Sequence, residues 1–137
     1  MQPIEVIIQK STGDCGIAAL AMILRLPYQQ VCQVALTLDK QALNKGLHRT
    51  ELVRIAEQLG YLTKFLRTFD PEEDEGIICL VPSTNRRGSG GHYVMLFNGC
   101  IVNPADGLVW PYEEYMKSRD DLASVGLLVV SRRTQSR

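Results

Sequence analysis

Residues 15–26 read CGIAALAMILRL, and this stretch decides the fold class. Apolar side chains would lie on nearly every side of the helix that it predicts, which is typical of a helix enclosed by a core. Asp14 precedes the stretch as a candidate N-cap, and Pro27 ends it because proline cannot continue a helix. We therefore expect a buried helix that begins at a cysteine.

Two further helices and then a series of strands are predicted downstream. The segments 28–38 and 50–59 place apolar side chains on one face, as amphipathic helices do, and Gly60 stops the second. Strand patterns follow at 61–69, 77–81, 92–97, 100–103 and 127–130, with a short helix around 111–117 and a strand-like lead-in at 4–8. Helices that precede antiparallel strands indicate an α+β fold, with N-terminal helices packed on a C-terminal antiparallel sheet.

The length and charge of the chain argue against several classes of protein. Its 137 residues suit a single domain over 1–137, with 132–137 as a disordered tail. A hydrophobic content of 45% and a net charge of +0 exclude a disordered chain and argue against nucleic-acid binding. No signal peptide is visible, and the longest apolar stretch, 16–24, is shorter than the roughly 20 residues that cross a bilayer. We expect a cytoplasmic protein that binds no membrane, in an oligomeric state that stays open.

The four cysteines are the next feature that bears on function. The cysteines are far apart in the sequence and form no Cys-x-x-Cys pair, and the chain has only two histidines as further possible metal ligands. The spacing therefore argues against a metal site. No cofactor is expected. In a reducing compartment we expect free thiols, with Cys32, Cys79 and Cys100 as core residues because they lie in apolar patterns.

Cys15 stands apart because it lies at the start of a predicted helix. Backbone N–H groups and the helix dipole favour a thiolate there, although the charge of Asp14 would oppose it. A cysteine nucleophile also needs a base, a group that orients the base, and donors for an oxyanion. His92 opens a predicted strand, Asn103 lies near it across the hairpin that turns at Asn98-Gly99, and Gln9 precedes Cys15 by six residues.

These residues resemble the papain-like cysteine peptidases, which use Gln, Cys, His and Asn or Asp in this chain order. The resemblance is closer to the bacteriocin-processing peptidases that remove double-glycine leaders. The elements that carry it, over nearly the whole chain, are Gln9, Asp14-Cys15-Gly16, the Ala/Leu/Met run at 18–23, His92-Tyr93-Val94 and Asn103-Pro104. The resemblance implies a papain-like fold and a thiol-dependent hydrolase. That family has Asp before the proline where this chain has Asn103, and Asp106 follows three residues later.

The resemblance also implies a role for each residue. Cys15 is expected to attack the carbonyl, His92 to act as base and then acid, and Asn103 to orient His92, with Asp106 as the alternative. Gln9 and the Cys15 N–H are expected to stabilise the oxyanion. The substrate is expected to be a peptide or protein that is cleaved after small residues such as Gly-Gly.

Two alternatives use the same scaffold. One is a deamidase or acyltransferase acting on a protein partner through the same thioester, and the other is a non-catalytic peptide-binding module. Transporter-linked members of the family carry membrane and ATPase parts that this sequence does not show, so their role in export is not expected to carry over.

Overall fold

The computed structural model describes residues 5–11, 13–44, 46–84 and 92–132. Its helices are α1 (Cys15–Leu24), α2 (Tyr28–Leu38), α3 (Arg49–Gln58) and α4 (Tyr112–Ser118). Its strands are β1 (Tyr61–Leu66), β2 (Gly76–Pro82), β3 (His92–Phe97), β4 (Cys100–Val102), β5 (Val109–Pro111) and β6 (Leu122–Arg132). The expected order of helices first and strands second is confirmed, with α4 inserted before the last strand.

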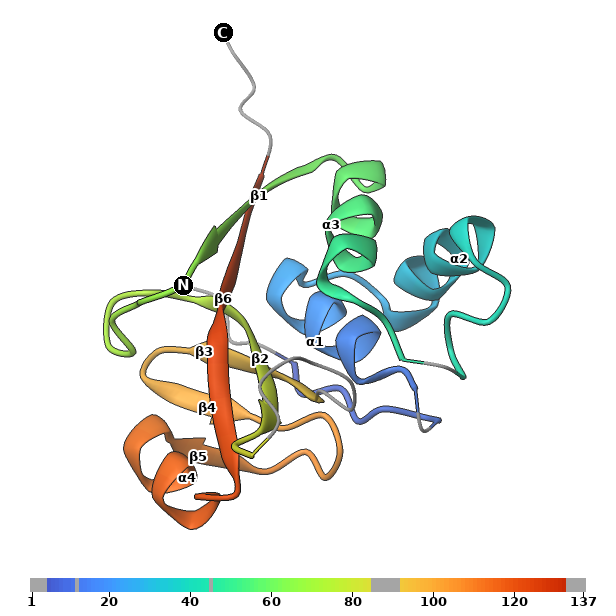
Figure 1. The fold of residues 1–137 in the computed structure, drawn as a ribbon. Coiled ribbons are helices and arrows are strands. Elements are labelled where there is room, and N and C mark those ends of the chain that lie inside the picture. Colours follow the sequence, from blue (N-terminus) through green and yellow to red (C-terminus); the bar gives the residue numbers. More distant parts are fainter. Residues whose placement is uncertain (1–4, 12, 45, 85–91, 133–137) are drawn as a thin grey trace, which may run out of the picture.

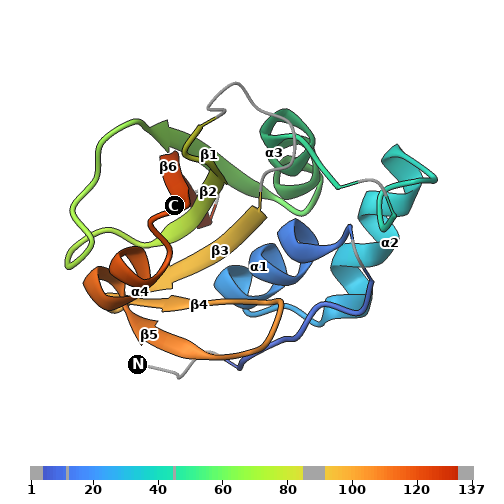
Figure 2. The same cartoon turned by 60° about the horizontal axis from the view of Figure 1, so that its bottom comes forward.

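The strands form an antiparallel sheet in the order β1-β6-β2-β3-β4-β5. Helices α1, α2 and α3 gather on one side of it and α4 lies on the other, as Figures 1 and 2 show from two directions. On the α1 side, Ile17 and Leu20 pack in one cluster with Ile77 of β2. On the other side, Tyr115 of α4 packs in a second cluster with Val94 of β3. The predicted α+β fold with N-terminal helices on an antiparallel sheet is confirmed.

The central helix α1 is buried along almost its whole length, as its composition predicts. It begins with the hydrogen bond from the Ala18 N–H to the carbonyl of Asp14 (2.9 Å). It ends earlier than predicted, because Arg25 adopts a left-handed conformation with φ of 57°. The Leu26 N–H then bonds the carbonyl of Ala21 (3.0 Å), which closes the helix before Pro27.

Of two expectations about the segment before α1, the strand is wrong and the N-cap is confirmed in position alone. Residues 5–8 of the predicted strand at 4–8 belong to no strand, and residue 4 lies outside the described residues. The segment is held instead by the Gln9 N–H, which bonds the carbonyl of Pro104 (2.8 Å). Asp14 occupies the N-cap position of α1 as predicted, but its side chain makes no capping hydrogen bond, because its carboxylate accepts from the backbone N–H groups of Lys10 (2.8 Å) and Ser11 (3.0 Å).

Strand β6 is much longer than the predicted 127–130, and it joins β1 to β2 in the sheet. A bulge lies opposite Cys79 and Leu80, where the pairing passes from Gly126 to Ser124. Gly126 has a φ of 154°, and a Cβ there would lie 2.5 Å from the Phe65 ring. Arg132 ends this strand, so the predicted tail at 132–137 begins one residue too early, and 133–137 lie outside the described residues.

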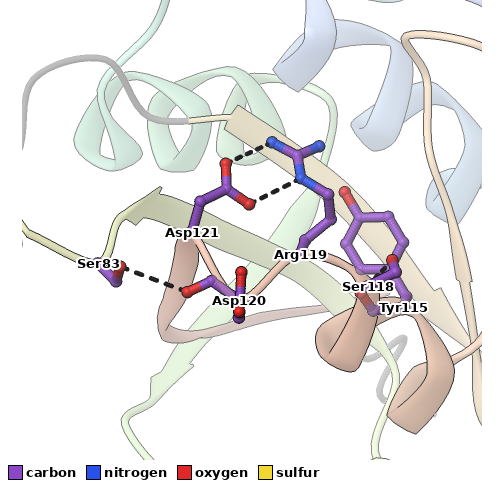
Figure 3. A network of polar contacts seen from close by, with 6 residues as sticks. All are labelled: Ser83, Tyr115, Ser118, Arg119, Asp120 and Asp121. Atoms are coloured by element: carbon purple, nitrogen blue, oxygen red, sulfur yellow. Dashed lines mark hydrogen bonds and ion pairs between the residues drawn. The ribbon is translucent and has the colours of Figure 1, made fainter.

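The turn between α4 and β6 is fixed to the end of β2 (Figure 3). Arg119 donates from Nε and Nη2 to the two carboxylate oxygens of Asp121 (3.0 Å each). The Ser83 N–H bonds the carbonyl of Asp121 (2.8 Å), and the Ser83 hydroxyl bonds that of Asp120 (3.4 Å). This turn lies at the same end of the sheet as His92, since β2 pairs Leu80 with His92.

None of the helices in the described residues is long and apolar enough to cross a lipid bilayer. The four cysteines are free thiols. Cys32 is buried as expected, but Cys79 and Cys100 are only partly buried. The described residues contain no cluster of three His, Cys, Asp or Glu side chains that could hold a metal ion.

Candidate active site

Three of the predicted site residues come together where α1 meets β3 and β4. Cys15 is the first residue of α1, His92 is the first residue of β3, and Asn103 directly follows β4. Gly16 allows the start of α1 to approach β3, because a Cβ at this position would lie 3.0 Å from Cδ2 of Tyr93. The small residue after the cysteine therefore helps to bring the thiol to the strand that carries the histidine.

A hydrogen bond joins His92 to Asn103, with Nε2 and Oδ1 2.8 Å apart. The register of β3 and β4 pairs Met95 with Val102, which sets Asn103 diagonally across from His92. The Ala105 N–H also donates to Asn103 Oδ1 (3.0 Å), which identifies that atom as the acceptor oxygen. His92 Nε2 must then carry its proton, and the other ring nitrogen, Nδ1, is left for Cys15.

The environment of Cys15 favours the thiolate. The side chain is only 8% exposed, and burial alone would raise the pKa of the thiol. Hydrogen bonds with the His92 side chain and with the backbone of Tyr93 and Gly16, together with the charge of His92, outweigh burial. The pKa of Cys15 therefore lies below its ordinary value.

The His92 ring is shifted in the complementary direction. Burial alone would lower its pKa, but hydrogen bonds to Cys15 and Asn103 and the charge on Cys15 raise it above the ordinary value. The positive charge of Arg119 acts weakly against this rise. Because one shift makes the cysteine lose its proton more readily and the other makes the histidine keep its proton longer, both favour a thiolate–imidazolium pair, which would be a strong nucleophile beside a general acid.

The loop after β4 holds Asn103 in place. The Asn103 N–H bonds the carbonyl of Leu108 (3.1 Å), and the Asn103 carbonyl accepts from the Gly107 N–H (2.7 Å). Asp106 is exposed, and its Oδ1 accepts from the Leu108 N–H (2.9 Å) within the same turn. Of the two residues considered for orienting His92, Asn103 makes the hydrogen bond to the ring.

The fourth predicted residue, Gln9, lies in the segment beside this loop. Its Nε2 donates to the carbonyl of Ser11 (2.8 Å), and its Oε1 is buried without a hydrogen-bond partner among the described residues. A primary amide has two N–H groups, so one remains for another acceptor. No hydrogen bond joins the Gln9 side chain to Cys15, His92 or Asn103 in the described part of the chain.

Tyr93 contributes to the site in a way that the sequence does not reveal. Its backbone hydrogen bond with the Cys15 thiol helps to lower the pKa of Cys15, and every residue except proline offers such a donor. Its hydroxyl donates to the carbonyl of Leu47 (2.8 Å), which ties β3 to the segment before α3. The aromatic residue after the histidine thus anchors the strand on which the histidine lies.

The sequence model of the Peptidase C39 family matches residues 3–108, most of the chain. The chain belongs to the peptidase C39 family. This C39 protein is therefore a cysteine peptidase, a hydrolase of amide bonds, and the resemblance to double-glycine leader peptidases is confirmed. No curated protein sequence matches it significantly.

Solved structures resemble this C39 peptidase over almost its full length. One is a double-glycine-motif protease from an AMS/PCAT transporter, in complex with the leader peptide (24% identity, TM-score 0.62, covering 95% of this chain and 92% of that chain). Another is the peptidase domain of Streptococcus ComA, a bi-functional ABC transporter involved in a quorum-sensing pathway (14% identity, TM-score 0.63, covering 95% and 99%). At these identities the likeness establishes the papain-like fold.

The shifted pKa values predict that Cys15 reacts selectively with alkylating reagents. Burial raises the pKa of Cys32 and of Cys79, whereas that of Cys15 is lowered. At pH 6.5 the native C39 peptidase should react with iodoacetamide at Cys15 at least about tenfold faster than at Cys32 or Cys79. Peptide mapping after short exposure measures the rates, with denatured protein as the control in which the preference disappears. Slower labelling of Cys15 than of Cys79 would contradict the thiolate assignment.

Asn103 and Asp106 offer a matched pair of variants. Asn103→Ala should lower kcat by about 10- to 100-fold, because the His92 ring loses the acceptor that fixes its tautomer and orientation. Asp106→Asn should leave kcat within about twofold, because the exposed side chain accepts from the Leu108 N–H and from no other group in the described part of the chain. Steady-state kinetics with one peptide substrate compare the two. A larger loss in Asp106→Asn than in Asn103→Ala would reverse the assignment.

Proposed function

We propose that this C39 peptidase cleaves a peptide or protein substrate after a pair of small residues such as Gly-Gly, through an acyl-enzyme on Cys15. The observation that carries the proposal is the hydrogen bond between the His92 ring and Asn103 Oδ1 (2.8 Å), in a ring whose pKa is also raised by its interaction with the Cys15 thiol. A related double-glycine-motif protease was solved with its leader peptide, which supports a peptide substrate of this kind.

The reaction proceeds in two halves. The Cys15 thiolate attacks the carbonyl of the scissile bond, and the tetrahedral intermediate collapses to a thioester when His92 gives its proton to the leaving amine. Water then enters, His92 takes a proton from it, and the attack of hydroxide on the thioester releases the new carboxylate and regenerates the thiolate. Asn103 keeps the ring in one orientation through both halves.

The oxyanion of each tetrahedral intermediate needs hydrogen-bond donors. The Cys15 N–H is available for this role because the first N–H groups of a helix have no partner within it. The remaining N–H of the Gln9 amide is the second donor, delivered by a segment whose backbone bonds the carbonyl of Pro104 beside Asn103.

Gln9→Ala should therefore lower kcat by about 10²-fold or more with a small change in KM, because the lost donor acts on the transition state. Gln9→Glu is the informative companion, since it keeps the size of the side chain but offers no N–H and brings a negative charge toward the oxyanion. Its kcat should fall at least as far. Equal kcat values for Gln9→Glu and the unaltered enzyme would remove Gln9 from the oxyanion hole.

The reaction type is tested by mass spectrometry on one substrate. A peptide that carries a single internal Gly-Gly, an internal glutamine and a free amine is incubated with the enzyme. Hydrolysis after Gly-Gly gives two fragments whose masses sum to that of the peptide plus one water. An intact peptide heavier by about one mass unit would mean deamidation, a product joined to a second amine would mean acyl transfer, and either outcome would replace the proposal.

A further inference from the structure

Asp14 is a buried carboxylate next to the nucleophile, and the mechanism above does not use it. Its side chain is 0% exposed. A buried charge is unfavourable unless it is fully hydrogen-bonded, so its donors show what holds this part of the chain together.

Three donors among the described residues bond the Asp14 carboxylate. The Lys10 N–H donates to Oδ2 (2.8 Å) and the Ser11 N–H donates to Oδ1 (3.0 Å). The third donor is the hydroxyl of Tyr28, which bonds Oδ2 from the first residue of α2. Two donors thus come from the segment before α1 and the third comes from a separate helix.

These bonds bring the backbone of Lys10 and Ser11 back to Asp14, which makes a turn between Gln9 and Cys15. The Gln9 amide donates to the carbonyl of Ser11 (2.8 Å), inside the same turn. The Ser11 hydroxyl bonds the carbonyl of Leu43 (2.5 Å), which anchors the turn to the chain after α2. The carboxylate therefore sets the position of the proposed nucleophile and of the proposed oxyanion donor together.

We infer that Tyr28 is a positioning residue for catalysis: its hydroxyl holds the Asp14 carboxylate, and through it the turn that presents Gln9 and Cys15. The inference rests on the proposed roles of Gln9 and Cys15. The hydrogen bond of Tyr28 goes to Asp14 and not to Gln9 or Cys15. Tyr28 therefore acts on these two residues indirectly, because it fixes Asp14 to helix α2.

The protonation states of the two groups fit this role. Burial alone would raise the pKa of Asp14, but the Tyr28 hydroxyl and the backbone N–H groups of Lys10 and Ser11 lower it further than burial raises it. Burial and the bond to Asp14 raise the pKa of Tyr28 well above its ordinary range. Tyr28 therefore keeps its proton and Asp14 keeps its charge wherever a cysteine peptidase works.

Other titratable groups also face this part of the molecule. The groups that face Asp14 or Cys15 are Lys10 from the preceding segment, Tyr28 and Cys32 from α2, Cys79 from β2, and His92 and Tyr93 from β3. Among them, His92 is the group that lowers the pKa of Cys15 most. A small displacement of Cys15 from His92 is therefore the change that the experiment should detect.

The experiment uses Tyr28→Phe, which removes the hydroxyl and keeps the ring. The alkylation rate of Cys15 by iodoacetamide is measured against pH in the full chain, so no substrate is needed. The apparent pKa of Cys15 should rise by about half a unit, which lowers its rate at pH 6.5 by about threefold. With a cleavable peptide, kcat should fall about fivefold while KM stays within about twofold, and the loss should be larger at pH 5.5 than at pH 8 because Asp14 protonates more readily.

Tyr115→Phe is the matched control. Tyr115 is 4% exposed, and its hydroxyl is buried without a hydrogen-bond partner among the described residues. Removal of this hydroxyl should therefore leave unchanged both the pH dependence of Cys15 alkylation and that of kcat. A folded Tyr28→Phe protein in which the alkylation rate of Cys15 depends on pH as in the unaltered enzyme would overturn the inference. If the unaltered enzyme cleaves no Gly-Gly peptide, the proposed function fails, while the alkylation profile still tests the role of Tyr28.

Asp14→Asn separates positioning from a simple effect of charge. An amide nitrogen cannot accept from the Ser11 N–H, so the turn should loosen and Cys15 should react more slowly. If Asp14 acted only as a nearby negative charge, its removal would stabilise the thiolate and speed the alkylation of Cys15. Faster alkylation in Asp14→Asn would therefore overturn the inference as well.

Discussion

Replacing Cys15 with alanine is expected to abolish peptide cleavage, with kcat reduced by at least about 10⁴-fold. The reason is that the thioester cannot form without the sulfur atom, and no neighbouring thiol has the same surroundings. Cys79 lies partly exposed on β2, and burial raises its pKa whereas that of Cys15 is lowered, so its thiolate is the less favoured of the two. Steady-state kinetics on a Gly-Gly peptide measure the loss.

Cys100→Ala is the control for this substitution. It removes the thiol of a side chain on β4 that takes part in no proposed step, and it should leave kcat within about twofold of the unaltered enzyme. Circular dichroism of both variants checks that each remains folded. A purified Cys15→Ala protein that still cleaves the peptide at a substantial fraction of the normal rate would end the account of Cys15 as nucleophile.

Replacing His92 with glutamine is expected to have the second largest effect, a loss of about 10³- to 10⁴-fold in kcat. Glutamine neither takes a proton from water nor gives one to the leaving amine at neutral pH. The same change removes the hydrogen bond that does most to lower the pKa of Cys15, so that pKa should rise. Alkylation of Cys15 at pH 6.5 should slow accordingly.

The control for His92 is the other histidine of the chain. His48 is exposed at the start of α3, and the bond it makes to Glu51 Oε1 comes from its backbone N–H (2.8 Å), which glutamine preserves. His48→Gln should therefore keep both kcat and the Cys15 alkylation rate. Loss of activity in His48→Gln comparable to that in His92→Gln would show that the assay reports stability instead of proton transfer.

Much of the fold was predictable because its strongest patterns are local. The apolar run of α1, the face pattern of α2 and the Asn98-Gly99 turn each follow from a few neighbouring residues. Two boundaries were not predictable in this way. Arg25 takes a left-handed conformation that seldom suits a residue with a side chain, and β6 gains its length from pairing with β1 and β2, which are distant in sequence.

The candidate site was also predictable in part, where local residue patterns carry it. Cys15, His92 and Asn103 were identified from residue type, order and hairpin spacing, and the structure brings their side chains together. The contact of Tyr28 with Asp14 joins two elements through packing that no short pattern encodes. The role of the Tyr93 N–H could not be predicted either, since every residue except proline has such a backbone donor.

The central claim is that Cys15, activated by His92, attacks the carbonyl carbon of the peptide bond that follows a pair of small residues. Its most direct test is labelling of the native enzyme with a peptide chloromethyl ketone that ends in Gly-Gly, followed by peptide mapping. The account predicts one adduct, on Cys15, that forms much more slowly in His92→Gln. An adduct that forms first on Cys32, Cys79 or Cys100, or labelling of Cys15 that is equally fast in His92→Gln, would contradict it.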